Sequence, residues 1–415
     1  QLCWFCTCSK FITKDYEKVK DYLKYLNKEI DLLFNFLNNN KIKLNVQTVF
    51  FGGGSPTILD RKDLKNLVDK LKGLFDWSKV VNFTIESDPR RVDEDRLLYN
   101  HNICGANRIS FGMQDFDPNV QRRVNRMQPA ELFKKILTKK VREAYKTIAF
   151  DLLIGQPGQT PETMTKTCDQ IVELQPTLVQ LSLMAYKPWI AKYQIKMLAE
   201  GPLPDFLERK ELLEIIHKKL KAAGYIRTGF ECYSLPDDPM TKAFKEGTAH
   251  YGASGHQTGG RVNFIAVGSS SKSNLGDNYY AQNFYDLNSY KKCLDKGVFP
   301  TFRGMKLSKH DKIRQHVTQQ LRSYFKIDFK QFERNFKINP KEFFSKEIEY
   351  LGEMIKDGLV TISNDSIKMT ELGKDFSQNI SNVFDEYDPP TKSYNERLST
   401  IQKAKLTQAK VQELI

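Results

Sequence analysis

The sequence predicts an α/β fold: a parallel β/α partial barrel of the TIM type, followed by a mainly helical, winged-helix-like C-terminal domain. Over residues 1–284, short apolar strands alternate with segments of helical periodicity, which is typical of parallel βα units. Polar residues gather directly after successive strands, where barrels and parallel sheets place their sites. Because several successive strand ends carry such residues, a barrel is favoured over a flat doubly wound sheet.

Three parts of the chain follow from this pattern. We expect a catalytic domain over residues 1–284, a helical accessory domain over 285–388 and a polar tail over 389–415. Within the accessory domain, a hairpin is expected at residues 359–362 and 367–370. Helices with such a hairpin resemble a winged-helix unit, for which covering a substrate is favoured over binding nucleic acid.

Three cysteines stand close together near the start of the chain, at Cys3, Cys6 and Cys8, and the others stand alone. Clustered thiolates favour a soft metal or an iron–sulfur cluster. A structural zinc site would need four ligands, normally two pairs, and no second pair occurs. Disulfides between such close cysteines would be strained. An iron–sulfur loop is therefore the leading interpretation, with surface thiols that bind no metal as the alternative.

A cluster with one open iron suits a loop of the form C-x3-C-x2-C. Cys3 and Cys6 supply only the last two positions of such a loop. We therefore expect the first cysteine ligand to lie upstream of Gln1.

The elements follow in order. Apolar residues at helical spacing predict helices over residues 19–37, 64–71, around 97, 120–126, 160–174 and 212–220. Short apolar runs predict strands at residues 46–51, 80–85, 107–112, 148–153, 178–184, 226–233 and 262–267. Further helices are expected at 306–325, 328–336 and 341–356.

The predicted strand ends carry the candidate binding residues. The first strand runs into Gly-Gly-Gly-Ser at residues 52–55, where glycine permits a close backbone approach and leaves N–H groups free for a ligand. Glu86 and Gln114 follow the next two strands, and Asp151 lies in the fourth. Each of these residues alone is more often a polar group that satisfies a loop, but several in order at strand ends indicate a site.

Composition sets limits on function. With 64 Lys and Arg against 50 Asp and Glu, the formal net charge is +14, which solvated helix faces or an acidic substrate would explain. No dense basic run with interleaved aromatic residues occurs, so nucleic-acid binding is not expected. No apolar stretch approaches the ~20 residues of a membrane-spanning helix, and no targeting signal is visible. With isolated, reduced cysteines, a cytoplasmic location is expected.

Five motifs together resemble those of radical S-adenosylmethionine (SAM) enzymes, and more narrowly those of oxygen-independent coproporphyrinogen III oxidases. The resemblance implies that the partial barrel is of the radical SAM type. Similarity continues through residues 235–238, 277–283, 302–305 and 356–360, so it covers nearly the whole chain, to about Tyr387. The five motifs are Cys-x2-Cys-x-Cys from Cys3, Gly-Gly-Gly-Ser-Pro-Thr from Gly52, Glu-Ser-Asp-Pro-Arg from Glu86, Asn-Arg-Ile-Ser-Phe-Gly-Met-Gln-Asp-Phe from Asn107 and Asp-Leu-Leu-Ile-Gly-Gln-Pro-Gly-Gln-Thr-Pro-Glu from Asp151.

The resemblance implies a [4Fe-4S] cluster and S-adenosyl-L-methionine as cofactors. Cys3 and Cys6 match the second and third cluster ligands, while Cys8 matches an additional cysteine of the family that is not a ligand. Phe5 matches a residue against the nucleoside side of the cofactor.

The remaining matched residues would bind the amino-acid and ribose parts of the cofactor. A zwitterionic sulfonium ligand needs carboxylates for its amine and hydroxyls and a guanidinium for its carboxylate. Gly53, Gly54 and Ser55 match the turn that meets the methionine amino group. Polar contacts to the amino acid and the ribose are implied for Glu86, Gln114, Arg126 and Asp151.

The implied activity is oxidative decarboxylation of coproporphyrinogen III propionates to vinyl groups in haem biosynthesis, driven by a 5′-deoxyadenosyl radical. The protein would position the cofactor and exclude water and oxygen. A tetrapyrrole substrate and a flavodoxin- or ferredoxin-like electron donor are the implied partners. A monomer is expected.

Two departures from the family pattern leave alternatives open. Where the family has a Tyr-Thr-Thr loop, this chain reads Gly-His-Gln-Thr-Gly-Gly-Arg at residues 255–261, and Ala253, Ser254 and Lys272 match its second-cofactor contacts. Tyr186-Lys187-Pro188-Trp189 lacks the family's His. These changes permit a radical methyltransferase, an anaerobic haem-degrading enzyme or a haem-trafficking protein. Less favoured is a nucleic-acid-binding role for the C-terminal unit.

Overall fold

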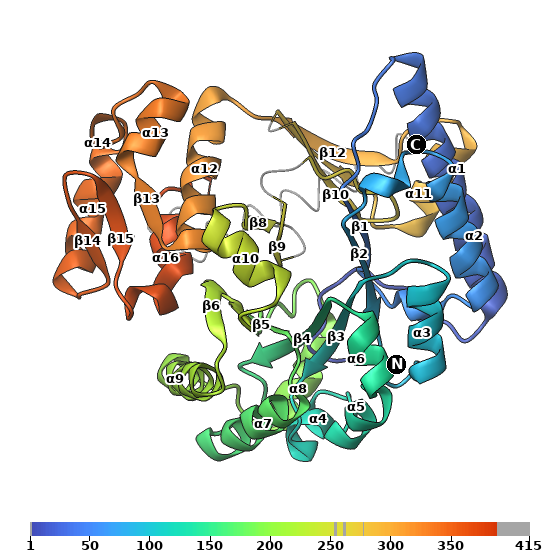
Figure 1. Ribbon diagram of the computed structural model, residues 1–415, viewed down its shortest axis with the longest axis horizontal. Helices are drawn as coiled ribbons and strands as arrows, with labels where there is room; N and C mark the ends of the chain where they lie inside the picture. Colours follow the sequence, from blue (N-terminus) through green and yellow to red (C-terminus); the bar gives the residue numbers. More distant parts are fainter. Residues whose placement is uncertain (1, 253–254, 260–262, 277, 388–415) are drawn as a thin grey trace. The chain divides into compact units, whose positions relative to one another are not determined.

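The computed structural model describes residues 2–252, 255–259, 263–276 and 278–387, and the described chain forms two compact units (Figure 1). Unit 1 comprises residues 2–27, 33–227 and 231–242. Unit 2 comprises residues 28–32, 228–230 and the described residues between 243 and 387. The domain boundary expected at residue 284 stays a prediction.

A seven-stranded sheet organises unit 1, with strand order β1-β2-β3-β4-β5-β7-β6. The first five strands pair in parallel, and β7 runs antiparallel to β5. Helices between the strands make the predicted alternation, and β1 to β4 follow one another side by side in Figure 1. The strands are β1 (Thr48–Phe51), β2 (Asn82–Ser87), β3 (Arg108–Gln114), β4 (Thr147–Ile154), β5 (Leu178–Leu183), β6 (Ile226–Gly229) and β7 (Cys232–Ser234).

Helix α2 illustrates the apolar face that helical spacing of leucines predicts. In α2, Leu64, Leu67 and Val68 are buried, and Asp60 caps the first turn by accepting from the Asp63 N–H. The helices are α1 (Tyr16–Asn39), α2 (Arg61–Lys72), α3 (Glu94–Asn102), α4 (Pro118–Arg123), α5 (Ala130–Ile136), α6 (Lys139–Ala144), α7 (Pro161–Leu174), α8 (Ile195–Ala199), α9 (Phe206–Ala222) and α10 (Pro239–Glu246), with 3-10 turns η1 (Pro56–Ile58), η2 (Trp77–Lys79) and η3 (Lys192–Gln194).

Strand β4 is buried along almost its whole length. Its sequence is apolar except for Thr147 and Asp151, and every residue but Asp151 is buried. A continuous apolar run of this kind is typical of a strand between two helical layers. The burial of its apolar neighbours, and not the β propensity of aspartate, therefore places Asp151 in this strand.

The described part of unit 2 contains two three-stranded antiparallel sheets, a short hairpin and a helical core. The predicted hairpin near residues 359–370 forms, with β13 as a third strand in the order β13-β15-β14. The elements are β8 (His250–Gly252), β9 (Gly255–Gln257), β10 (Lys272–Leu275), β11 (Tyr279–Asn283), β12 (Thr301–Lys306), β13 (Lys326–Asp328), β14 (Val360–Ile362), β15 (Ser366–Met369), α11 (Leu287–Asp295), α12 (Lys309–Tyr324), α13 (Phe329–Phe336), α14 (Pro340–Phe343), α15 (Ser345–Lys356), η4 (Gly373–Phe376) and α16 (Ser377–Asn382).

Several predicted bounds were wrong. The strand expected at residues 226–233 is two strands, because Gly229 takes φ +152° beside His256, whose Nε2 would lie 2.0 Å from a Cβ at that position. The helix expected over 120–126 ends at Arg123, since Asn125 is left-handed with φ +55°. The helix expected over 341–356 is divided at Phe344 into α14 and α15.

The strand expected at residues 262–267 is also wrong over its described part, residues 263–267. Phe264 forms one isolated bridge with Asn274. The amide of Ala266 donates to Ser273 Oγ over 3.0 Å, so a side chain takes the place of the ladder. The sheet β10-β11-β12 that lies beyond was not anticipated.

A pair of glycine variants tests the packing of the C-terminal core. A Cβ at Gly373 would lie 1.9 Å from the Leu359 carbonyl oxygen, whereas one at Gly352, inside α15, would meet no described atom within 4 Å. We expect Gly373→Ala to lower the free energy of unfolding by about 2 kcal/mol through overpacking. Gly352→Ala should raise it by up to about 1 kcal/mol, because alanine is the better helix former. Thermal unfolding of both variants should therefore shift in opposite directions, and equal shifts would contradict the described packing.

Candidate cofactor site

The parallel pairing brings the carboxyl ends of four strands to one edge of the sheet. Phe51 at the end of β1 pairs with Ile85, and Ile85 in turn pairs with Ile109 of β3. Glu86 of β2 therefore lies one residue beyond the level at which β1 ends, and Gln114 is the last residue of β3. Asp151 lies on β4, next in the sheet. The predicted strand-end residues thus come from adjacent strands.

Two carboxylates lie together at this edge. Glu86 Oε2 accepts a hydrogen bond of 3.0 Å from the Gly53 N–H, and Ser110 Oγ donates to Asp151 Oδ2 over 3.2 Å. Burial, reinforced by the negative charge of Asp151, raises the pKa of Glu86 to about 7. Burial likewise raises the pKa of Asp151 to about 6. A cationic ligand would stabilise the ionised form of carboxylates whose pKa burial has raised.

The glycine turn after β1 leaves room for this arrangement. A Cβ at Gly52 would lie 2.7 Å from Glu86 Cδ, so a larger residue would displace the carboxylate. Gly53 has φ +93°, which glycine adopts without strain. A Cβ at Gly53 or Gly54 would meet no described atom within 4 Å, so the turn borders open space. Ser55 turns away into a contact of 3.1 Å between its Oγ and Thr57 Oγ1.

The cysteine loop approaches the same edge. Cys3 is buried, Cys6 half-buried and Cys8 exposed. A hydrogen bond from the Cys8 thiol lowers the pKa of Cys6 to about 5, and the same interaction raises the pKa of Cys8. The negative charge of Cys6 also contributes to the raised pKa of Glu86. Among described residues no three His, Cys, Asp or Glu side chains converge to hold a metal ion.

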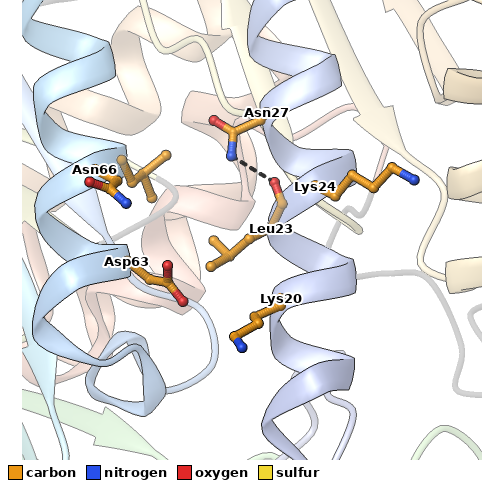
Figure 2. Close-up of a pocket in the computed structure, with 7 residues that line it drawn as sticks. Lys20, Leu23, Lys24, Asn27, Asp63 and Asn66 are labelled. Carbon is orange, nitrogen blue, oxygen red and sulfur yellow. Dashed lines mark hydrogen bonds between the residues drawn. The ribbon is translucent and has the colours of Figure 1, made fainter.

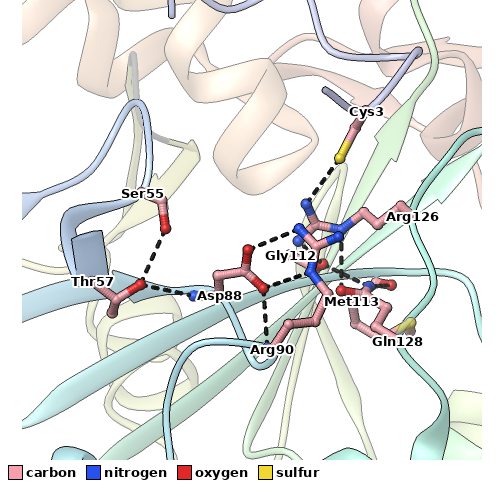
Figure 3. Close-up of polar contacts among 9 residues, drawn as sticks. All are labelled: Cys3, Ser55, Thr57, Asp88, Arg90, Gly112, Met113, Arg126 and Gln128. Atoms are coloured by element: carbon pink, nitrogen blue, oxygen red, sulfur yellow. Dashed lines mark hydrogen bonds and ion pairs between the residues drawn. The ribbon is translucent and has the colours of Figure 1, made fainter. Parts of the chain in front are cut away.

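Arg126 connects the cysteine loop to β3 (Figure 3). Its Nη1 donates to Cys3 Sγ over 3.3 Å, its Nη2 to the Gly112 carbonyl over 2.7 Å and its Nε to Gln128 Oε1 over 3.1 Å. A Cβ at Gly112 would lie 2.8 Å from Gln114 Nε2 and 3.1 Å from Arg126 Nη2. The side chains of Gln114 and Arg126 therefore both pass close to Gly112, where a larger residue would collide with them.

The Glu-Ser-Asp-Pro-Arg motif contains two further residues, Asp88 and Arg90, to which the sequence alone assigned no role. Arg90 grips Asp88 with both ends of its guanidinium, from Nε to Oδ1 and from Nη2 to Oδ2, each over 2.8 Å (Figure 3). Burial alone would raise the pKa of Asp88, but the hydrogen bonds and charge of Arg90 outweigh it and lower the pKa. Asp88 is thus an ionised carboxylate whose charge is balanced by Arg90, and Glu86 has no such ion pair among the described residues.

A segment after β5 holds the cysteine loop by its main chain, and the sequence patterns did not indicate it. Gln194 is fully buried, donates from Nε2 to the Phe5 carbonyl over 2.8 Å and to the Ala185 carbonyl over 3.0 Å, and accepts from the Lys187 N–H over 2.6 Å. The only signal in the sequence would have been a glutamine directly before the apolar residues of α8. Lys10 adds a hydrogen bond of 2.7 Å to the Cys6 carbonyl.

Phe5 lies apart from the polar group. It packs with Trp4 against a buried cluster of Val124, Leu153, Met184 and Met197. No described contact joins Phe5, Gly54 or Ser55 to Glu86 or Asp151. The structure therefore brings together Cys3, Cys6, Gly53, Glu86, Gln114, Arg126 and Asp151, and leaves Phe5, Gly54 and Ser55 beside them.

The residues that depart from the family pattern near position 256 belong to unit 2. His256 lies in β9, buried beside the rings of Phe230 and Tyr251, and burial lowers the pKa of its imidazole to about 4. Lys272 opens β10 and is exposed. Ala253, Ser254, Gly260 and Arg261 lie outside the described residues.

The residues at the strand ends fit the implied cofactors. Cys3 and Cys6 offer two thiol ligands, and two desolvated carboxylates lie beside space bounded by a bare glycine turn. One guanidinium, Arg126, keeps N–H groups beyond those used by Cys3, Gly112 and Gln128 and can meet a carboxylate. This donor set suits a cluster bound beside a zwitterionic sulfonium amino acid.

A separate pocket of about 220 Å³ lies between α1 and α2 (Figure 2). Lys20, Leu23, Lys24 and Asn27 from α1 line it together with Asp63, Asn66 and Leu67 from α2. None of the predicted site residues is among them. No helix in the described chain combines the length and hydropathy that crossing a bilayer requires.

Comparison with known proteins agrees with this geometry. Residues 1–171 match the family model of the radical SAM superfamily, and residues 307–376 match that of the HemN C-terminal domain. The oxygen-independent coproporphyrinogen III oxidase of Pseudomonas aeruginosa is 33% identical over 94% of this chain and 84% of its own length. That of Helicobacter pylori is 32% identical over 93% and 83%.

The solved structure of coproporphyrinogen III oxidase from Escherichia coli, described as a radical SAM enzyme, superposes with a TM-score of 0.86 at 31% identity. The match covers 93% of this chain and 88% of that one, which confirms the predicted fold class. The cofactor class of this chain, an iron–sulfur cluster with S-adenosylmethionine, follows from the superfamily match. The chain belongs to the oxygen-independent coproporphyrinogen III oxidase family of radical SAM enzymes.

Proposed function

We propose that this chain catalyses the oxygen-independent oxidative decarboxylation of coproporphyrinogen III, which converts two propionate side chains to vinyl groups and gives protoporphyrinogen IX. The observation that carries the proposal is the meeting of Glu86, Asp151, Arg126 and the cysteine loop at one sheet edge in a chain similar to coproporphyrinogen oxidases over nearly its whole length. For each propionate, the carboxylate leaves as carbon dioxide, and the remaining side chain gives up one hydrogen atom and one electron.

The residues of the chain would hold the cofactors and shield the reaction. Bound together, the cluster and S-adenosylmethionine supply the one-electron, hydrogen-abstracting chemistry of the superfamily. Cys3 and Cys6 would hold the cluster, and Glu86 would take the cationic amine. Asp151 would accept from ribose hydroxyls and Arg126 would donate to the cofactor carboxylate. Glu86 and Asp151 are carboxylates that no ion pair balances among the described residues, and Arg126 has N–H groups that its protein contacts leave available.

We further propose the partners and location of this activity. A tetracarboxylate substrate is complementary to a chain with a net charge of +14. The electron would come from a flavodoxin- or ferredoxin-like donor, and the electron released by each propionate would pass to an external one-electron acceptor. The protein would act as a monomer in the reducing cytoplasm, where free cysteines persist.

The reaction can be tested directly. The full-length protein, reconstituted anaerobically with iron and sulfide, is incubated with coproporphyrinogen III, S-adenosylmethionine and dithionite plus an electron acceptor. We expect mass spectrometry to show products that have lost carbon dioxide and two hydrogens from one propionate and then from a second, together with 5′-deoxyadenosine. Omission of S-adenosylmethionine is the control and should give neither product.

Other outcomes would select the sister activities. Methylated tetrapyrroles would indicate a methyltransferase, and ring-opened haem would indicate a haem-degrading enzyme. Haem binding without any deoxyadenosine would indicate a trafficking protein. Each of these results in place of vinyl products would overturn the proposal.

Glu86→Gln tests the role of the buried carboxylate. Because the pKa of Glu86 is raised from its ordinary 4.5 to about 7, the folded protein binds the proton more tightly than the unfolded chain. The contribution of Glu86 to stability therefore falls as pH rises from about 4.5 to 7. Without cofactors, Glu86→Gln should be more stable than the wild type above pH 7, by roughly 1–3 kcal/mol. The difference should shrink towards pH 4.5 in denaturant unfolding curves.

The same substitution should weaken S-adenosylmethionine binding about tenfold or more, since a charged hydrogen-bond partner is lost. Glu131→Gln, on the exposed face of α5, is the matched control and should change neither property. A stability difference that does not vary with pH would contradict the raised pKa. Unchanged cofactor affinity would contradict the assigned role.

A further inference from the structure

Gln128 occupies a central place in the site that no motif indicated. Its side chain is fully buried, and both ends of the amide form hydrogen bonds. Nε2 donates to the Gly112 carbonyl over 2.9 Å and to the Met113 carbonyl, while Oε1 accepts from Arg126 Nε over 3.1 Å (Figure 3). One amide thus contacts both the end of β3 and the guanidinium of Arg126.

The end of β3 has an unusual backbone that this amide supports. The pairing of β3 with β4 shifts register between Phe111 and Gln114, and Gln114 takes φ +69°. A left-handed conformation at a residue other than glycine is disfavoured and persists where surrounding contacts enforce it. The carbonyls of Gly112 and Met113 lie inside this irregular stretch. A second amide, Gln156 Nε2, donates to the Gln114 carbonyl over 3.2 Å.

Gln128 is itself held rigidly. Gln121 Oε1 accepts from the Gln128 N–H over 2.8 Å, and Gln121 Nε2 donates to the Gln128 carbonyl over 2.9 Å. Gln121 Nε2 also donates to the Asp115 carbonyl over 2.8 Å. The main chain of Gln128 is therefore fixed with respect to β3, and its side chain can act as a spacer of constant length between β3 and Arg126.

We propose that Gln128 is a positioning residue for S-adenosylmethionine: it sets the orientation of Arg126 and the bulge that presents Gln114. An isolated arginine can rotate about its side-chain torsions, and binding a carboxylate would then require ordering it. Gln128 accepts from Nε and Gly112 accepts from Nη2, so the guanidinium is held in one orientation with Nη1 against Cys3 Sγ. The inference rests on the proposed cofactor roles of Arg126 and Gln114 and not on the tetrapyrrole assignment.

Gln128→Met tests the proposal, because it keeps the volume but removes all three hydrogen bonds. Titration of S-adenosylmethionine into the reduced, reconstituted protein is followed by the EPR spectrum of the cluster, which needs no tetrapyrrole. We expect affinity to fall about tenfold, as for loss of one hydrogen bond to a charged group. Iron content should match the wild type, and KM for coproporphyrinogen should stay within about twofold.

Gln319→Met is the matched control. Gln319 lies on α12 of unit 2, and its Nε2 donates to the Tyr251 carbonyl over 2.9 Å. The same chemical change there should leave S-adenosylmethionine affinity within about twofold of the wild type. An equal loss in both variants would show a general loss of native packing and overturn the proposal.

Gln128→Glu adds a test that a purely structural role would not pass. Oε1 could still accept from Arg126, but an ionised carboxylate would face two carbonyl oxygens; once protonated, it could donate to one of them. The affinity of Gln128→Glu relative to the wild type, measured at each pH, should therefore improve as pH falls from about 8.5 to 6. A flat ratio would overturn the proposal, even if Gln128→Met failed to fold.

Hydrogen exchange provides a readout without any cofactor. In the cluster-free protein, the amides of residues 112–115 should exchange faster in Gln128→Met than in the wild type, because the carbonyls of the bulge lose their donors. Residues 178–183 of β5 should be unaffected. Unchanged exchange at 112–115 together with unchanged cofactor affinity would show that Gln128 only fills space.

Discussion

The ligand preference of the carboxyl edge of the sheet depends on carboxylates that are buried away from water. Asp88 is paired with Arg90 through two hydrogen bonds and stays ionised, so it is already neutralised by the protein. Glu86 and Asp151 have no ion-pair partner among the described residues, and burial raises the pKa of each. The fold therefore satisfies one carboxylate internally and leaves two for a ligand. Because Glu86 and Asp151 are left without an ion pair, this edge of the sheet favours a cationic ligand, while the paired Asp88 adds no unbalanced charge to the fold.

The parallel sheet could be predicted from the sequence because its signals are local. Apolar runs such as residues 148–153 between helical segments indicate buried strands, and strand ends in a parallel sheet must share an edge. Glu86, Gln114 and Asp151 can be grouped on that basis from the order of residues alone. Two of the predictions that were wrong, at residues 226–233 and 262–267, concern segments where a glycine conformation or a serine hydroxyl decides the outcome. Such contacts depend on distant residues and leave no periodic pattern.

The supporting glutamines could not have been found from spacing. Gln128 and Gln194 act on main-chain atoms of β3 and of the cysteine loop, distant from them in the sequence. A glutamine that binds carbonyls looks no different in sequence from one that faces solvent. Arg126 could be named only through the family resemblance, and the structure adds that it contacts Cys3 Sγ as well as the end of β3. Residues that bind are thus easier to predict than residues that orient them.

The hydrogen bonds between the Gln194 side chain and main-chain atoms have an evolutionary consequence. Because they hold the backbone at Phe5, Ala185 and Lys187, they are indifferent to which side chains those positions carry. A substitution at Lys187 can therefore leave the shape of the cysteine loop unchanged, whereas the side chain of Tyr186 packs against the same buried cluster as Phe5. Divergence of the surface after β5 is in this way uncoupled from maintenance of the redox centre, and relatives built on this scaffold could explore new substrates without rebuilding their cluster loop.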